Sequence, residues 1–319
     1  MKLPYFDAHC DTCTRGQPLR RNALHIDLER LSAYGPAAQV FAIFTRLRRG
    51  TGGAAMPDFT QPDVPADILM GLYDREIASL HAQLAENEDL AVLCRSAAEA
   101  KSAARAGKVA VFIAVEGAEL LGCSLDKLRS AYDQGVRLVN MTWNWPNRLS
   151  GTCMAGGGLT AEGRAFVRGA QEMGVAVDMS HISEAAFWDT LEEARRPVIA
   201  GHSDSRALTD HPRNLTDAQF TALVQTGGGA GLNLWPDLLG LGRDVEAVVA
   251  HAEHFLALGG EKAVFLGTDL DGIGETPRGI AGVQDMGAVY EAMLRQNWSE
   301  DLVRDIFYNN LYGILERAL

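Results

Sequence analysis

The amino-acid sequence predicts a (β/α)8 barrel of the TIM type, and three observations lead to this prediction. The chain has 319 residues, of which 47% are hydrophobic and 22% are charged, and a barrel of roughly 250 residues with insertions fits that length. Short apolar runs alternate with segments of helical periodicity, as expected of repeated βα units around a parallel sheet. Several of these runs end in His, Asp or Glu, and barrel enzymes carry their functional residues at the carboxyl ends of the strands.

Eight apolar or β-branched runs are the predicted barrel strands. Helix signals separate them: Ser183 is a candidate N-cap, Thr216 and Gln219 form a candidate capping box, and the segment 125–134 ends before Gly135. An open doubly wound sheet is the alternative, but no Gly-rich phosphate-binding fingerprint follows the first run. Because the composition does not break along the chain, residues 1–319 are predicted to form one domain. The strands are predicted at 3–8, 39–45, 109–115, 136–142, 175–179, 197–201, 229–234 and 263–268.

One stretch, residues 46–67, interrupts this alternation. It is rich in Gly, Pro and polar residues and precedes a predicted helix at about 66–86. A loop of this length in a compact domain is usually functional or disordered, and here it would leave the second strand at the mouth of the barrel. The sequence is compatible both with a lid-like insertion and with a surface excursion.

Charge and composition exclude several classes of function. The formal net charge of -12 leaves no basic field for nucleic acid or an anionic membrane. No run approaches 18 consecutive apolar residues, and the N-terminus has no apolar stretch of signal-peptide length. Cys10 and Cys13 have C-x-x-C spacing, but no second pair completes a four-thiolate site. The five cysteines are interpreted as reduced thiols in a cytoplasmic protein.

Metal-type ligands stand where five of the eight predicted strands end. His9 and Asp11 are two residues apart, so side chains at the end of the first strand can point to the same face. Any one of these residues could be an ordinary surface or capping residue, but their repetition around one rim favours a site. His251 and His254 fall in a predicted helix, and His25, His81 and His211 lie outside strand ends, so we assign these five to surface, loop or helix positions. The strand-end residues are His9, Asp11, Glu116, His181, His202, Asp269 and Asp271.

Three imidazoles and several carboxylates form a ligand set that suits zinc, and their number exceeds one tetrahedral site. Glu116 can bridge two ions roughly 3.5–4 Å apart. His9 and Asp11 would complete one ion, and His181 and His202 the other. Such a pair can hold a water between the ions as hydroxide and polarise a carbonyl oxygen. Asp269 is then not needed as a metal ligand, and it could take a proton from the bridging water and pass it to the nitrogen that leaves as the C–N bond breaks.

The chain resembles the membrane dipeptidase (renal dipeptidase) family of zinc-dependent amidohydrolases, in its bacterial soluble form, over nearly its whole length. The motifs that carry the resemblance are Asp7-Ala8-His9-Cys10-Asp11, Glu116-Gly117, Gly135-Val136-Arg137-Leu138, Gly158-Leu159-Thr160-Ala161-Glu162-Gly163, Asp178-Met179-Ser180-His181, Gly201-His202-Ser203, Pro212-Arg213-Asn214-Leu215 and Gly267-Thr268-Asp269-Leu270-Asp271-Gly272.

The resemblance implies roles for individual residues. It makes Arg213 the arginine that binds the carboxylate of a dipeptide, a task for which a guanidinium fork is well shaped. Asp269 matches the family's acid/base aspartate, and Asp271 is a neighbouring structural or substrate-site residue. Trp143 stands where many members carry a histidine, and indole can donate one hydrogen bond but cannot carry a proton. The implied zinc ligands are His9, Asp11, Glu116, His181 and His202, with Glu116 bridging.

Three functions remain open at this point. The first is a binuclear zinc dipeptidase that cleaves small dipeptides with a free carboxylate. The second is a related amidohydrolase that acts on a lactam or cyclic amide, because one metal site serves many substrates on one fold. The third is a non-catalytic binding protein on the same barrel, against which the intact ligand set argues. The side chains and the L or D configuration of the substrate remain open, as does assembly into a homodimer.

Overall fold

The computed structural model describes residues 2–44, 65–240 and 242–319. Apart from its last three residues, the predicted lid-like insertion 46–67 lies outside these ranges. The helix predicted after it is confirmed as α2 (Ala66–Glu86), with Leu69, Tyr73, Ile77, Leu80 and Leu84 buried at helical spacing.

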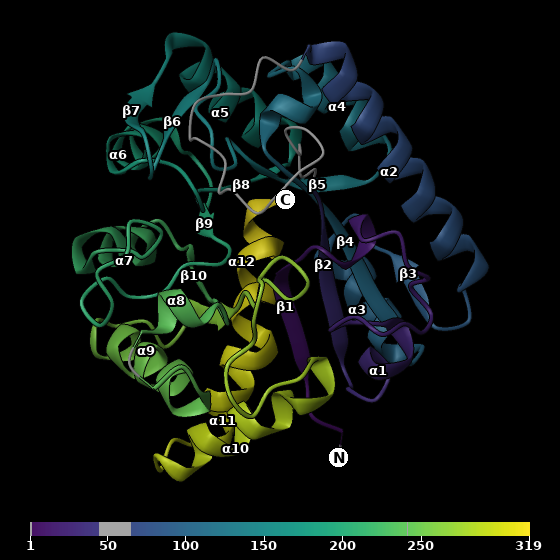
Figure 1. Cartoon of the computed structure of the whole chain (residues 1–319), viewed down its shortest axis with the longest axis vertical. Helices are drawn as coiled ribbons and strands as arrows, with labels where there is room; N and C mark the ends of the chain where they lie inside the picture. Colours follow the sequence, from purple (N-terminus) through teal and green to yellow (C-terminus); the bar gives the residue numbers. More distant parts are fainter. Residues whose placement is uncertain (1, 45–64, 241) are drawn as a thin grey trace, which may run out of the picture.

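Eight parallel strands close into a barrel, which confirms the predicted fold class (Figure 1). Each of the eight predicted runs overlaps one of them. Closure depends on two pairings between strands. β1 (Tyr5–Cys10) pairs with β11 (Val264–Leu266), where Asp7 lies opposite Leu266, and β2 (Ala37–Ile43) pairs with β4 (Val109–Glu116) along Ala38–Ile43 of β2. The barrel strands, in spatial order, are β1 (Tyr5–Cys10), β2 (Ala37–Ile43), β4 (Val109–Glu116), β5 (Val136–Asn140), β8 (Ala176–Asp178), β9 (Ile199–Ala200), β10 (Gly229–Leu232) and β11 (Val264–Leu266).

Three further strands were not predicted from the sequence. β3 (Ala91–Leu93) pairs with the beginning of β4, outside the closed ring, while β5 pairs with the end of β4. β6 (Ser150–Thr152) and β7 (Gly156–Leu159) form a small antiparallel ribbon. β6 and β7 are short and β7 is mostly glycine, so neither forms an apolar run that the sequence pattern can reveal. β3 belongs to the short apolar run 90–94, which was not assigned as a strand from the sequence.

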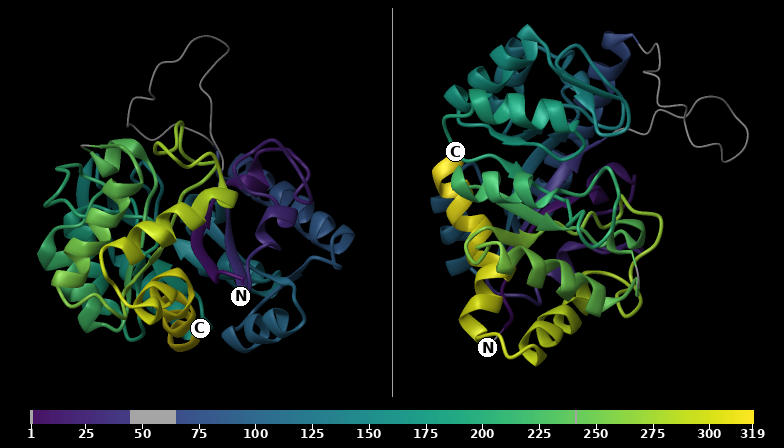
Figure 2. Two further views of the ribbon diagram at one scale, coloured as in Figure 1. Left: turned by 90° about the horizontal axis from the view of Figure 1, so that it is seen from below. Right: turned by 90° about the vertical axis from the view of Figure 1, so that its left-hand side faces the viewer.

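The helices pack around the barrel, and their predicted start signals are confirmed. Ser183 caps α6, and Thr216 and Gln219 form a complete capping box at α7. Figure 2 shows the helices arranged outside the strands. Besides α2, the α-helices in the described ranges are α1 (Leu28–Leu31), α3 (Ala97–Arg105), α4 (Leu125–Asp133), α5 (Ala161–Met173), α6 (Glu184–Glu193), α7 (Asp217–Gln225), α8 (Pro236–Leu239), α9 (Val245–Ala257), α10 (Met286–Arg295), α11 (Glu300–Arg304) and α12 (Asn310–Ala318).

Alternation along the strands divides the buried side chains between two cores. Phe6 and Ala8 of β1 and Phe112 of β4 pack with residues of α3 and α12 in the smaller core. The intervening residues of the same strands, such as Tyr5 and Ile113, belong to the larger core. Two-sided burial of this kind is typical of a parallel sheet covered by helices, and it gives the strand ends a rigid base.

Candidate metal centre and active site

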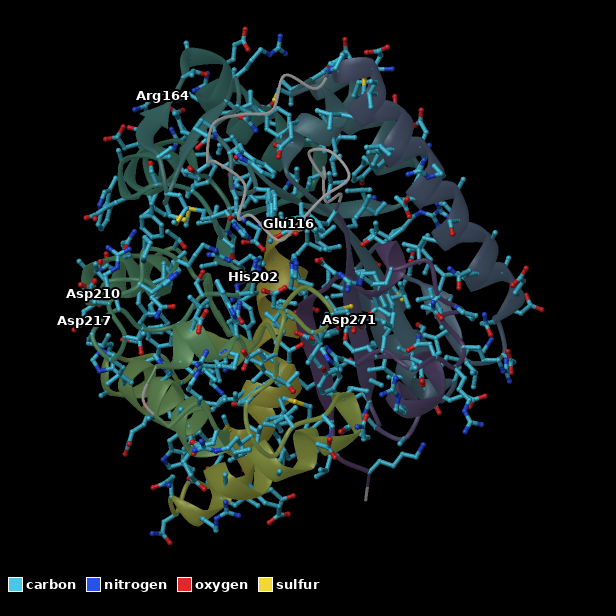
Figure 3. All side chains as sticks on the ribbon, viewed as in Figure 1. Glu116, Arg164, His202, Asp210, Asp217 and Asp271 are labelled. Carbon is cyan, nitrogen blue, oxygen red and sulfur yellow. The ribbon has the colours of Figure 1, made fainter. Side chains whose placement is uncertain are left out.

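The carboxylate of Glu116 lies among three imidazoles at the ends of the strands. Its Oε1 atom is 2.9 Å from Nε2 of His181, 3.4 Å from Nε2 of His202 and 3.6 Å from Nε2 of His9. All four residues are buried, and they come from the ends of β1, β4, β8 and β9. Figure 3 shows Glu116 and His202 close together in the middle of the molecule. The structure thus brings together four of the residues singled out from the sequence.

Two further carboxylates lie beside His9. Its Nε2 atom is 3.5 Å from Oδ1 of Asp11 and 4.0 Å from Oδ1 of Asp269. Among the described residues, two groups have ligand atoms within 4.8 Å of one another: His9, Glu116 and His202, and His9, Asp11 and Asp269. His9 belongs to both groups, so the two candidate ion positions are adjacent. The second group includes Asp269, which was not assigned as a metal ligand from the sequence.

The unpaired polar atoms at this site fit a metal. Nε2 of His9 and Oδ1 of Asp11 are buried and have no hydrogen-bond partner in the part of the chain that the structure describes. A buried polar atom of this kind costs roughly 1–3 kcal/mol when nothing replaces its lost water. A cation between them would satisfy both atoms. The donor set of imidazole nitrogens and carboxylate oxygens is the one that zinc prefers when no thiolate takes part.

The surroundings of Glu116 and His181 keep these two groups in metal-binding forms. Burial alone would raise the pKa of Glu116, but His9, His181 and His202 together hold it well below its usual range, so Glu116 remains a carboxylate. Burial, reinforced by the Arg213 guanidinium, lowers the pKa of His181 to about 4. Neutral imidazole and ionised carboxylate are the protonation states that bind metals.

Asp269 differs from Glu116 in its surroundings. Burial raises its pKa to about 7, against the lowering influence of His9. A Cβ atom at Gly272 would lie 2.1 Å from Oδ1 of Asp269 and 3.0 Å from Oδ2 of Asp11. Because glycine has no Cβ atom, position 272 leaves room for the carboxylates of Asp269 and Asp11.

Left-handed backbone conformations occur at three residues of the rim. The φ angles of His181, Asp269 and Asp271 are 75°, 57° and 69°, and such conformations in non-glycine residues cost of order 1–3 kcal/mol each. Backbone hydrogen bonds hold two of them: Cys153 N donates to His181 O at 2.8 Å, and Asp269 N donates to His9 O at 3.1 Å. Strain held in this way clusters at functional sites.

Two buried aspartates support the rim from below, and the sequence interpretation gave neither of them a role. Asp7 accepts hydrogen bonds from Thr268 N at 2.8 Å and from Thr268 Oγ1 at 2.6 Å. Asp178 accepts from Ser180 N at 2.8 Å and from Gly201 N at 2.9 Å. Each aspartate thus joins the strand end of one candidate ligand to the next strand. The sequence did contain a signal for these two aspartates. Each is a charged residue within an apolar run, two or three positions before a candidate metal ligand.

Asn233 is a rim residue that the sequence interpretation missed. It follows β10, and its Nδ2 atom lies 3.3 Å from both His202 O and Oδ2 of Asp269. It therefore links the strand end that carries one candidate ligand to the candidate acid/base residue. The strand-end rule would have found Asn233 if amides had been counted together with His, Asp and Glu.

Arg213 reaches the metal-ligand cluster from the loop after β9. It is buried, and its Nη2 atom lies 3.1 Å from Nε2 of His181. A pocket opens beside both residues. It is lined by Cys153, Met179, His181, Ile182, Glu184, Phe187, Ser203, Arg206, Pro212, Arg213, Asn214, Leu215 and Gln219.

Trp143 and Asp271 border the cluster in different ways. The Trp143 ring centroid lies 4.6 Å from that of Phe44, 4.5 Å from that of Trp145 and 6.5 Å from that of His181. Asp271 uses both carboxylate oxygens within the protein: Thr12 Oγ1 donates to Oδ2 at 2.5 Å, and His25 N donates to Oδ1 at 2.8 Å. Asp271 thus fastens the loop after β1 to the loop after β11.

Comparisons with known proteins identify the family of the chain. The fold and the ligand cluster define a metal-dependent hydrolase on a (β/α)8 barrel. Residues 1–318 match the model of the membrane dipeptidase family, peptidase family M19, and the chain belongs to this family. It is accordingly a metallo-dipeptidase, a hydrolase that acts on peptide bonds, as the sequence predicted.

Three relatives illustrate the likeness. An uncharacterized protein in the pqqA 5′ region of Klebsiella pneumoniae is 30% identical over 272 residues, which cover 81% of this chain and 98% of that protein. Dipeptidase 3 of Macaca fascicularis is 32% identical over 221 residues, which cover 66% of this chain and 45% of that protein. A metallo peptidase from Rhodobacter sphaeroides, liganded with a phosphinate mimic of the dipeptide L-Ala-D-Ala, has a TM-score of 0.91 and 28% identity, with 100% of both chains covered.

Although the family name refers to membranes, no helix within the described ranges of this chain is both long and apolar enough to cross a bilayer.

Proposed function

We propose that the protein is a binuclear zinc dipeptidase that hydrolyses small dipeptides with a free C-terminal carboxylate. The observation that carries this proposal is the position of Arg213, whose guanidinium lies 3.1 Å from the Nε2 atom of the candidate ligand His181. A cation at that place can bind the carboxylate of a dipeptide while the neighbouring peptide bond faces the metal ligands.

We assign five residues as zinc ligands, with Glu116 between the two ions. The proximity of Glu116 Oε1 to three imidazoles supports its bridging position. When bound, zinc supplies Lewis acidity, which polarises the peptide carbonyl and activates a water molecule. The ligands are His9, Asp11, Glu116, His181 and His202.

Asp269 is assigned the proton transfer. In this role one carboxylate oxygen accepts a proton from the attacking water, and the same carboxyl group then donates that proton to the amide nitrogen as the peptide bond breaks. The hydrogen bond from Asn233 to Oδ2 leaves Oδ1 directed toward His9 and Asp11. Glu116 contributes to catalysis by holding negative charge at the centre of the site.

Trp143 and Asp271 shape the walls of the substrate site. Trp143 presents an aromatic surface next to His181 and can donate one hydrogen bond, so any proton transfer falls to Asp269. Asp271 holds the loop after β1 against the loop after β11 through Thr12 and His25. We therefore assign Asp271 an indirect part in substrate binding.

Two further proposals concern the chain as a whole. β1 and β11 pair directly, so the barrel needs residues from both ends of the sequence, which supports a single catalytic domain over residues 1–319. All five cysteines are free thiols. This is the state that a reducing compartment maintains, and it supports a cytoplasmic enzyme.

A hydrolysis screen tests the substrate class. We expect zinc-loaded protein to cleave free dipeptides and to leave N-acylated and amidated dipeptides largely intact. The Rhodobacter relative, bound to a mimic of L-Ala-D-Ala, makes the pair L-Ala-D-Ala and L-Ala-L-Ala the first comparison. Hydrolysis of lactams or cyclic amides without hydrolysis of dipeptides would favour the other amidohydrolase function and overturn the proposal.

Metal content is the second test. Protein grown with zinc should hold up to two zinc ions per chain, and His181→Ala should lose zinc and activity together, because Nε2 of His181 faces Glu116 at 2.9 Å. Elemental analysis and activity measurements on the same samples check this expectation. His254→Ala is a matched control, since His254 on α9 pairs with Asp217 on α7, away from the ligand cluster. A folded unmodified protein without transition metal would contradict the two-zinc assignment.

A further inference from the structure

We infer that Asn144 is a positioning residue that fixes the ring of His181 and thereby helps the protein retain zinc. The inference deepens the proposed function and rests on it, because His181 must be a zinc ligand. Oδ1 of Asn144 lies 2.9 Å from Nδ1 of His181. On the other side of the same ring, Nε2 lies 2.9 Å from Oε1 of Glu116.

This contact selects one tautomer of His181. An amide oxygen can only accept a hydrogen bond, so Nδ1 of His181 carries the proton and Nε2 keeps its lone pair. The lone pair then points toward the centre of the site, where a ligand nitrogen is needed. Metal-binding histidines commonly have their second ring nitrogen held in this way, and loss of the partner typically costs 10–100-fold in metal affinity or activity.

The other two imidazoles have no such support. Nδ1 of His9 and Nδ1 of His202 are both buried and have no hydrogen-bond partner among the described residues. Packing holds these two rings instead, since their centroids lie 3.9 Å apart. His181 lies farther out, with its ring centroid 5.1 Å from that of His202 and its backbone at a φ of 75°. The ring of His181 is therefore packed less closely than the other two, and it is the one that a polar side chain holds in place.

The loop that carries Asn144 is itself anchored to the strand end of Glu116. Nδ2 of Asn147 donates to Oε2 of Glu119 and to Met141 O, both at 2.8 Å. Oδ1 of Asn147 accepts from Leu149 N at 2.8 Å, which closes the turn. Glu119 lies in the 3-10 helix Ala118–Leu121, which is separated from Glu116 only by Gly117. The position of Asn144 is thus set relative to the same carboxylate that His181 faces.

Zinc retention measures this role directly. Zinc-loaded unmodified protein, Asn144→Leu and Asn144→Asp are placed in a chelator series, and bound zinc is determined by elemental analysis. We expect Asn144→Leu to hold at least one zinc about 10–100-fold more weakly. Asn144→Asp should retain zinc as the unmodified protein does, because its carboxylate accepts the same hydrogen bond. Asn144→Ala, which removes the oxygen without adding apolar surface, should match Asn144→Leu.

Further comparisons separate positioning from general stability. The melting temperatures of the metal-free variants should agree with that of the unmodified protein, and Asn309→Leu, at an exposed asparagine paired with Asp305, should leave zinc retention unchanged. Equal zinc retention by Asn144→Leu, Asn144→Ala and the unmodified protein would overturn the inference while leaving the proposed function intact. An unmodified protein without zinc would overturn the proposed function itself, so the two failures can be distinguished.

Discussion

Replacing Asp269 with asparagine is expected to lower kcat/KM for dipeptides by about 10²–10⁴-fold, the range for a lost acid/base group, while most of the zinc stays bound. The amide keeps the shape of the carboxylate and an oxygen that can accept the hydrogen bond from Asn233. It cannot accept and return a proton at neutral pH. The loss should therefore fall on turnover rather than on metal content.

The geometry around Asp269 makes the zinc measurement decisive. Asp269 belongs to a potential ion-binding group with His9 and Asp11, yet its Oδ1 is 4.0 Å from Nε2 of His9, farther than the 3.5 Å of Asp11. Elemental analysis of Asp269→Asn, beside Asp217→Asn as an exposed control, distinguishes the two roles. If Asp269→Asn loses both zinc ions, Asp269 is an essential ligand and the proton-transfer assignment is wrong.

The strands and many of their ends could be predicted from the sequence because the barrel strands are mostly apolar runs and several of them are followed closely by polar residues. β4 is the clearest case, with seven apolar residues before Glu116. β9 is only two residues long in the structure, but its flanking residues extend the apolar run enough to reveal it. β3, outside the ring, lies in the short apolar run 90–94, but no His, Asp or Glu follows that run at once, so the strand-end signal is missing there.

The network that orients the site could not be predicted in the same way. Asn144 and His181 are 37 residues apart, and His25 and Asp271 are 246 apart, so only the closed barrel brings each pair together. Arg213 shows the same limit. Nothing in its local sequence separates it from a surface arginine, and only the family resemblance suggested its role. Strand periodicity places ligands on a rim, but it carries no information about which loops fold over that rim.

The second large effect is expected from Arg213→Ala, measured on a dipeptide and on its amide. A hydrogen bond to a charged group contributes roughly 1.5–3 kcal/mol, and about 1.4 kcal/mol corresponds to a tenfold change. Arg213→Ala should therefore lower kcat/KM for free dipeptides by roughly 10- to 100-fold, with unchanged zinc content. The amide lacks the carboxylate, so it should be a poor substrate of the unmodified enzyme and lose little more on mutation.

Arg206 is a matched control for this comparison because it lines the same pocket and supports the same loop. Its guanidinium donates to His211 O at 3.3 Å and to Pro212 O at 3.0 Å, so Arg206→Ala should affect the dipeptide and its amide by equal factors. Measuring kcat/KM for the dipeptide and for its amide, on the unmodified enzyme and on Arg213→Ala, gives a thermodynamic cycle. This cycle isolates the coupling between Arg213 and the substrate carboxylate. Equal losses for acid and amide in Arg213→Ala would mean that Arg213 also only supports the loop, and the cyclic-amide function would then become the better explanation of the site.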